Sequence, residues 1–145
     1  MTGKTVVFLC VANSARSQMA EGLARARAPR GWRVFSAGSN PARLSTTAVA
    51  AMREIGIDIS SQRSKGMQDV PLEEADLIIT LCAEEVCPLY LGAARRLHWP
   101  LPDPAGLGEG EEASRRRFRA VRDELRERIG RFLSEEGILP GEVRG

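Results

Sequence analysis

The chain has 145 residues, of which 43% are hydrophobic and 28% charged, and its formal net charge is +2. This composition is typical of a globular protein, and so small a charge does not indicate nucleic acid or a membrane surface as a partner. No apolar stretch approaches the roughly 20 residues that cross a bilayer, and the N-terminus lacks the apolar region of a signal peptide. We therefore expect a cytoplasmic protein, in which structural disulfides are rare.

The first predicted element is a buried strand over residues 5–11, which is β-branched and apolar throughout. It leads into a Cys-x5-Arg loop, residues 10–16, and an amphipathic helix then runs from residue 17 to about residue 27. A loop that closes onto a helix N-terminus aims several backbone N–H groups at one point, which suits a tetrahedral oxyanion. We expect the following residues to bind the anion: Val11, Ala12, Asn13, Ser14, Ala15 and Ser17.

Cys10 and Arg16 are the candidate reactive groups of this loop. Arg16 can bind two oxygens of an oxyanion through its planar guanidinium fork. The positive field that attracts the anion also favours the thiolate of Cys10, which makes Cys10 a candidate nucleophile. Asn13 tolerates the left-handed backbone that a tight loop requires. The alternative interpretation is that Cys10 is an inert, buried side chain at the end of a strand.

A second strand is predicted over residues 33–36, and Gly38 and Pro41 follow it. A helix is predicted next over residues 45–55, with Gly56 at its C-terminal end. We assign four side chains of this helix to its inner face: Thr46, Val49, Ala50 and Met52.

A third buried strand is predicted over residues 76–81, and two cysteines follow it. Cys82 lies at the carboxyl end of this strand, at the sheet edge where Cys10 is also expected. Cys87 comes five residues later. Residues five apart on a regular helix do not face one another, so a disulfide between these two requires the segment to rearrange. The pair therefore indicates a redox switch.

Two other interpretations of this cysteine pair are open. Cys82 and Cys87 could be unrelated buried side chains. They could also form a metal site with His98, the sole histidine of the chain. Such a site lacks a fourth ligand unless Cys10 is recruited, which would disrupt the anion pocket. We therefore predict no bound metal.

A short fourth strand is predicted over residues 97–99, and Asp103 and Pro104 lie in the proline-rich loop after it. A carboxylate held near an anion site can protonate a departing oxygen as a general acid. Asp-Pro is also a common turn dipeptide, so Asp103 needs this context to be a candidate. We assign His98, near the end of the strand, no catalytic role.

The last predicted element is a helix over residues 111–133. Its apolar side chains recur at helical spacing and are expected in the core: Phe118, Val121, Leu125, Ile129 and Phe132. The order of elements predicts an α/β fold, a single doubly wound four-stranded parallel sheet flanked by helices, with ligands beyond the carboxyl ends of the strands. We expect a single catalytic domain over residues 1–136 and a loose C-terminal tail over residues 137–145.

The chain resembles the low-molecular-weight tyrosine phosphatases in four segments: Cys10 to Ser17, Gln18-Met19-Ala20-Glu21-Gly22, Ser36-Ala37-Gly38 and Asp103-Pro104. Within that fold it most resembles the thioredoxin-coupled arsenate reductases. The specific signs are Thr80-Leu81-Cys82 with a second cysteine soon after, and His98-Trp99 before Asp103-Pro104. The resemblance covers nearly the whole chain.

This resemblance implies that three cysteines convert arsenate to arsenite without a cofactor. Cys10 would attack arsenate bound by the loop and Arg16, while Asp103 protonates the leaving oxygen. Cys82 would then form a disulfide with Cys10 and release arsenite. Cys87 would finally displace Cys10, leaving a Cys82–Cys87 disulfide for thioredoxin to reduce. We expect a monomer with arsenate as its substrate and thioredoxin as its protein partner.

Two features depart from the family pattern. The two later cysteines are closer together than in the best-known members. Those members often bind potassium near the loop, whereas the matching region here reads Arg63-Ser64-Lys65. Because an ammonium group can replace a cation electrostatically, we predict that activity does not depend on potassium.

Two other functions remain as alternatives. A phosphatase acting on phosphotyrosine would use Cys10, Arg16 and Asp103 and would hydrolyse a phosphocysteine. Phosphatases of this fold usually carry aromatic residues after the Asp-Pro pair, where this chain has Ala105 and Gly106. Weak phosphatase activity is expected even of a reductase, because the first half-reaction is shared. A non-enzymatic oxyanion- or metal-binding regulator would need neither a general acid nor further thiols.

Overall fold

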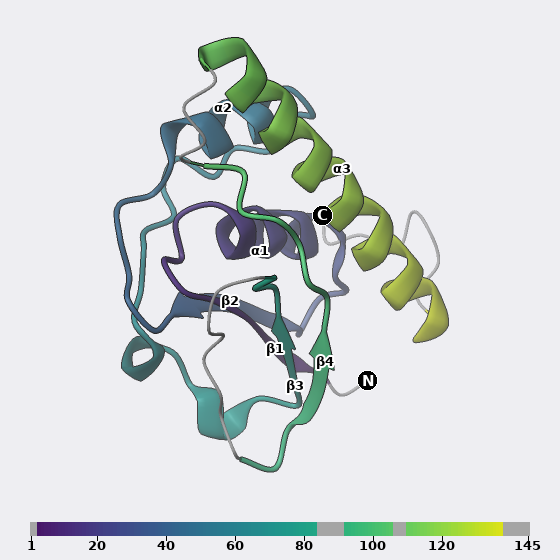
Figure 1. Ribbon diagram of the computed structural model, residues 1–145. Helices are drawn as coiled ribbons and strands as arrows, with labels where there is room; N and C mark the ends of the chain where they lie inside the picture. Colours follow the sequence, from purple (N-terminus) through teal and green to yellow (C-terminus); the bar gives the residue numbers. More distant parts are fainter. Residues whose placement is uncertain (1–2, 84–91, 106–109, 138–145) are drawn as a thin grey trace.

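The computed structural model of the chain describes residues 3–83, 92–105 and 110–137 (Figure 1). Residues 138–145 of the expected tail lie outside the described residues. The elements in chain order are β1 (Thr5–Cys10), α1 (Arg16–Arg27), β2 (Arg33–Gly38), α2 (Thr46–Arg53), the 3-10 helices η1 (Met67–Asp69) and η2 (Leu72–Glu74), β3 (Leu77–Thr80), β4 (Arg95–His98) and α3 (Glu111–Glu135).

The four strands form one parallel sheet in the order β2-β1-β3-β4. Cys10 is in register with Gly38 of β2, and Thr80 of β3 is in register with His98 of β4. All four strands therefore end along the same edge of the sheet. The predicted α/β fold, a four-stranded parallel sheet flanked by helices, is confirmed.

Side chains on the two faces of the sheet enter different layers, because successive residues of a strand point to opposite sides. Val6 and Phe8 of β1 belong to the larger core, which includes side chains of α1, α2 and α3. Val7 and Leu9 face the other way, into a smaller cluster with Val70 and residues near η2. Figure 1 shows the three α-helices together on one side of the sheet.

The long helix α3 packs against α1 and α2 with the apolar stripe that its sequence predicts. All five residues of that stripe are buried, with at most 8% of their surface exposed: Phe118, Val121, Leu125, Ile129 and Phe132. Arginines occupy much of the remaining helix surface. No helix in the described part of the chain has the length and hydrophobicity that a membrane crossing requires.

The inner face of α2 differs from the sequence-based assignment. Met52 is buried as expected and Val49 is partly buried, but Thr46 and Ala50 are exposed. Ala48 and Ala51 take the inner positions instead. The prediction was wrong here because small alanines fit closely against the neighbouring helices. In a short helix with few large apolar residues, tertiary packing determines which face is buried.

Candidate active site

The loop after β1 is held from outside by residues 39–45. Four carbonyl oxygens of the loop accept backbone hydrogen bonds from this segment: Cys10 O from Ser39 N (3.4 Å), Val11 O from Asn40 N (2.9 Å), Ala12 O from Ala42 N (2.8 Å) and Ser14 O from Ser45 N (2.9 Å). In a planar trans peptide unit the C=O and N–H point in opposite directions, so the N–H groups that follow these carbonyls face the inside of the loop. The loop thus presents donors of the kind that binds a tetrahedral oxyanion.

Cys10 is a free thiol with 2% of its surface exposed. The backbone N–H of Asn13 donates to its sulfur at 3.2 Å, and the Ser17 hydroxyl lies 2.8 Å from it. The Ser17 oxygen accepts a hydrogen bond from Asn13 Nδ2 at 2.7 Å, which leaves the hydroxyl proton free to point at the sulfur. Both contacts can donate to a thiolate, so the site is suited to an anionic sulfur nucleophile.

Asn13 is the central residue of the loop, and its predicted left-handed backbone is confirmed by a φ of 49°. Its side chain is fully buried. Nδ2 donates to Ser17 Oγ and to Ser36 Oγ, while Oδ1 accepts from Gln18 Nε2 at 2.9 Å and from Lys65 N at 2.8 Å. These four hydrogen bonds use all the donor and acceptor directions of the amide and fix its orientation.

Arg16, the first residue of α1, extends toward the loop that carries Asp103. Its Nη1 donates to Leu101 O at 3.0 Å, and its Nη2 lies 4.0 Å from Asp103 Oδ2. Arg16 is buried, whereas the Asp103 side chain is 56% exposed and accepts a hydrogen bond from Ala105 N at 3.0 Å. The structure therefore places the guanidinium of Arg16 near the Asp103 carboxylate, and Cys10 lies at the other end of the loop that leads into Arg16. Leu101 was missed by sequence reasoning, because no local pattern marks a backbone acceptor.

Cys82 lies just beyond β3, at the same sheet edge as Cys10. The backbone of Leu81 continues the pairing with β1, since Leu81 N donates to Leu9 O at 2.9 Å. Cys82 has 1% of its surface exposed and is disulfide-bonded. Cys87 lies outside the described residues. The prediction that Cys82 shares an edge with Cys10 is thus met by the strand register.

A second group of polar residues surrounds the buried carboxylate of Glu21 and is linked through Ser36 to Asn13 of the loop. Glu21, with 2% of its surface exposed, accepts a hydrogen bond from Ser36 Oγ at 2.6 Å. Its carboxylate also pairs with Lys65 Nζ at 3.3 Å and with Arg25 at 3.0 Å. Buried carboxylates require such partners, which here come from α1 itself, from β2 and from residue 65.

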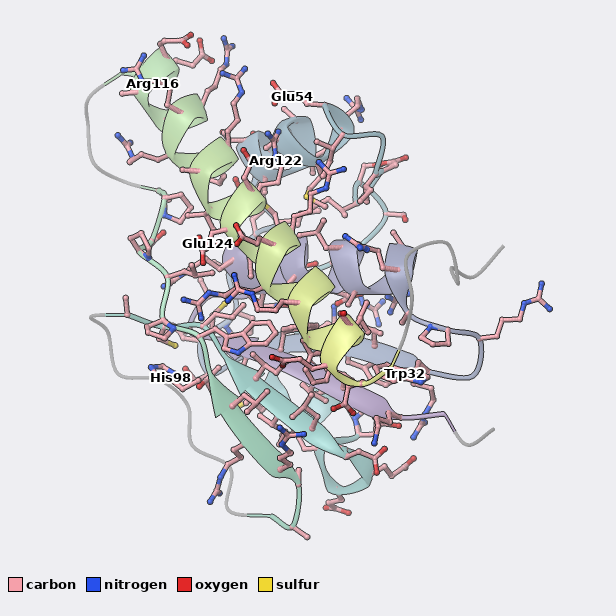
Figure 2. The ribbon with its side chains drawn as sticks, turned by 90° about the vertical axis from the view of Figure 1, so that its right-hand side faces the viewer. Trp32, Glu54, His98, Arg116, Arg122 and Glu124 are labelled. Carbon is pink, nitrogen blue, oxygen red and sulfur yellow. The ribbon has the colours of Figure 1, made fainter. Side chains whose placement is uncertain are left out.

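Of the three candidate metal ligands, Cys82 and His98 lie among the described residues and Cys87 does not. The part of the chain that the structure describes holds no cluster of three or more histidine, cysteine, aspartate or glutamate side chains. His98 is exposed, and its Nδ1 lies 2.7 Å from Thr80 Oγ1, which ties the ends of β3 and β4 together. Figure 2 shows His98 at the end of β4.

Known proteins are similar to this chain over most of its length. The family model "Low molecular weight phosphotyrosine protein phosphatase" matches residues 5–138. An arsenate reductase of Bacillus licheniformis is 48% identical over 134 residues, which are 91% of this chain and 96% of that protein. The solved structure of an arsenate reductase in the phosphate binding state has a TM-score of 0.75 at 35% identity, covering 91% of this chain and 98% of that one. A thioredoxin-dependent arsenate reductase of Corynebacterium glutamicum has a TM-score of 0.70 at 31% identity, covering 93% of this chain and 62% of that one.

Proposed function

Because the chain belongs to the low molecular weight phosphotyrosine protein phosphatase family, and its relatives include arsenate reductases, we propose that it reduces arsenate to arsenite with Cys10 as the nucleophile. One observation carries this proposal. A free, buried Cys10 lies in a loop of inward-facing donors, and a disulfide-bonded Cys82 follows the neighbouring strand at the same edge. A phosphatase requires the first of these features but has no use for the second.

The first step is the attack of the Cys10 thiolate on arsenate. The loop N–H groups and the guanidinium of Arg16 bind the oxyanion and neutralise its charge. Asp103 protonates the oxygen that leaves as water, and a Cys10–arsenic bond forms. The 4.0 Å separation of Arg16 Nη2 and Asp103 Oδ2 supports this assignment, because it places the proposed acid beside the guanidinium that would bind the oxyanion.

The next two steps are thiol exchanges. The Cys82 thiolate attacks the Cys10 sulfur, the sulfur–arsenic bond breaks, and its electron pair leaves with arsenic as arsenite. The two cysteines are thereby oxidised to a Cys10–Cys82 disulfide. Cys87 then attacks Cys82, restores the Cys10 thiol and forms a Cys82–Cys87 disulfide. A free Cys10 and a disulfide-bonded Cys82 at the same sheet edge are the combination expected at the end of this relay.

Thioredoxin is the proposed reductant of the final disulfide. The similarity to a thioredoxin-dependent arsenate reductase supports this choice. A dithiol reductant and thiols that must return to the reduced form are typical of the cytoplasm, where we place the protein as a monomer. The relay uses the chain's own sulfurs and requires neither a metal nor an organic cofactor. Residues 1–136 form the proposed catalytic domain, and truncation after residue 137 is expected to retain turnover.

Phosphatase activity is the second candidate function. It is favoured by the family model and by the shared arrangement of Cys10, Arg16 and Asp103. Water would then hydrolyse a phosphocysteine, with no part for Cys82. We propose this as a weak side activity, because Ala105 follows the Asp-Pro pair and provides no aromatic wall for a substrate ring.

The test is arsenate-dependent NADPH consumption with thioredoxin and thioredoxin reductase. Wild type is compared with Cys82→Ser and Cys87→Ser, and hydrolysis of para-nitrophenyl phosphate serves as the control for an intact loop. We expect both variants to lose arsenate turnover and to retain phosphatase activity. A wild type that hydrolyses the phosphate ester well but does not turn over arsenate would identify the protein as a phosphatase.

A further inference from the structure

The carbonyl of Ala12 has a second hydrogen-bond donor besides the backbone of the outer segment. Ala42 N donates to it at 2.8 Å, and Ser64 Oγ donates to it at 3.1 Å. Ser64 is 52 residues away in the sequence and is only partly buried. Its hydroxyl contacts neither Cys10 nor the concave side of the loop in any hydrogen bond that the structure shows.

The Ala12 carbonyl belongs to the same peptide unit as the Asn13 N–H, which donates to Cys10 Sγ at 3.2 Å. The unit is planar, so a donor that holds the oxygen on one side also aims the N–H at the sulfur on the other side. The two groups cannot be oriented independently. Any contact that fixes the Ala12 oxygen therefore acts on the nucleophile.

The backbone conformation of Asn13 favours a flip of this peptide unit by half a turn. Asn13 has a φ of 49°, in the left-handed region that costs energy for a residue with a Cβ atom. A half-turn of the unit would move Asn13 into the extended region and relieve that cost. It would also replace the N–H beside the sulfur by a carbonyl oxygen, which repels both a thiolate and an oxyanion.

Ser64 is itself anchored on both sides. Lys65 N donates to Asn13 Oδ1 at 2.8 Å, and Gly38 N donates to Lys65 O at 2.9 Å. On the other side, Gln18 Nε2 donates to Arg63 O at 2.8 Å. The hydroxyl therefore meets the loop from a fixed backbone.

We propose that Ser64 is a positioning residue for Cys10: through the Ala12 carbonyl it holds the Ala12–Asn13 peptide unit with its N–H on the nucleophilic sulfur. The proposal rests on Cys10 being the nucleophile, which reductase and phosphatase chemistry share. It does not depend on which of the two reactions the protein performs.

The test measures the rate at which iodoacetamide alkylates Cys10 at a series of pH values. Mass spectrometry of the peptide that contains Cys10 separates its alkylation from that of the other cysteines. In Ser64→Ala we expect the midpoint of the pH profile to rise and the rate at neutral pH to fall roughly threefold to tenfold, as for the loss of one hydrogen bond. Ser64→Thr keeps a hydroxyl and is expected to lie within about twofold of wild type. Ser61→Ala, a matched change at an exposed position of the same segment, should leave the profile unchanged.

Urea unfolding of the same variants separates positioning from stability. A Ser64→Ala protein that unfolds more easily but keeps the wild-type alkylation profile overturns the proposal, and so does a Ser64→Thr protein that behaves like Ser64→Ala. The assay contains neither arsenate nor thioredoxin. A wild type without arsenate turnover would therefore refute the reductase function while leaving the effect of Ser64 measurable.

Discussion

At the scale of single residues, Lys65 places its positive charge next to the buried carboxylate of Glu21, which is linked to the Cys10–Arg16 loop. Its ammonium lies 3.3 Å from Glu21 Oε1 and donates to Arg63 O at 2.9 Å. Glu21 is linked in turn through Ser36 to the amide of Asn13. The cation thus helps to hold the hydrogen-bond chain that ends at the nucleophile.

We expect turnover of the wild type to be equal in potassium and sodium buffers of the same ionic strength, because Lys65 already supplies the charge at Glu21. Lys65→Met should lower arsenate turnover several-fold, since it leaves the buried carboxylate with fewer partners. Steady-state kinetics in both salts measures this. Lys4→Met is the control, because Lys4 is a half-exposed lysine near the N-terminus, distant from Lys65 in the sequence. Stimulation of the wild type by potassium would contradict the prediction.

At the scale of elements, the start of α2 is fixed by Ser45. Its hydroxyl accepts a hydrogen bond from Ala48 N at 3.2 Å, as an N-cap residue does. Ser45→Ala should lower the free energy of unfolding by about 1 kcal/mol, and urea denaturation followed by circular dichroism measures the change. Thr46→Ala, one residue on and exposed, should change it little. An equal loss in both variants would rule out a capping role for Ser45.

The helix α3 contributes buried apolar side chains to the core. Leu125 is fully buried in the cluster that includes residues of all three α-helices. Leu125→Ala should destabilise the fold by about 2–5 kcal/mol, because it removes buried methyl groups and leaves a cavity. The unfolding free energy of Arg126→Ala, whose side chain is exposed, provides the comparison. A cost below about 1 kcal/mol for Leu125→Ala would contradict this packing.

At the scale of the whole molecule, a cluster of charges joins α2 to α3. Arg119 donates to both carboxylate oxygens of Glu54, and Arg122 Nη1 donates to Glu54 Oε1 at 2.8 Å. Figure 2 shows Glu54, the C-cap residue of α2, close to Arg122 of α3. The hydrogen bonds from Arg119 and then Arg122 lower the pKa of Glu54 from 4.5 to about 2.

This shift predicts how stability depends on pH. Because the pKa of Glu54 is lower in the folded state than in the unfolded state, its stabilising contribution is fully present above about pH 4.5 and is lost as the pH falls toward 2. Glu54→Gln should therefore flatten the fall in melting temperature over this range. Glu73→Gln, at an exposed glutamate, is the control. A Glu54→Gln protein with the wild-type pH profile would show that the ion pairs contribute nothing to folding.

Features whose causes lie within a few residues of one another could be predicted from the sequence. The strand, the Cys10–Arg16 loop and the helix after it follow from local patterns, as does the left-handed Asn13. The buried stripe of α3 follows from its helical period. Parallel strands also end at one sheet edge, and on that basis the sequence predicts Cys82 at the same edge as Cys10.

Which distant groups complete the site depends on the packing of separate segments in the folded protein. Ser64 binds Ala12 across 52 residues, Lys65 reaches Glu21 across 44, and Arg16 donates to Leu101 across 85. Likewise, Ala48 and Ala51 form the buried face of α2, whereas Thr46 and Ala50 are exposed. Local patterns encode periodicity, caps and turns, whereas these contacts depend on how separate segments pack against one another, which no short stretch of sequence specifies.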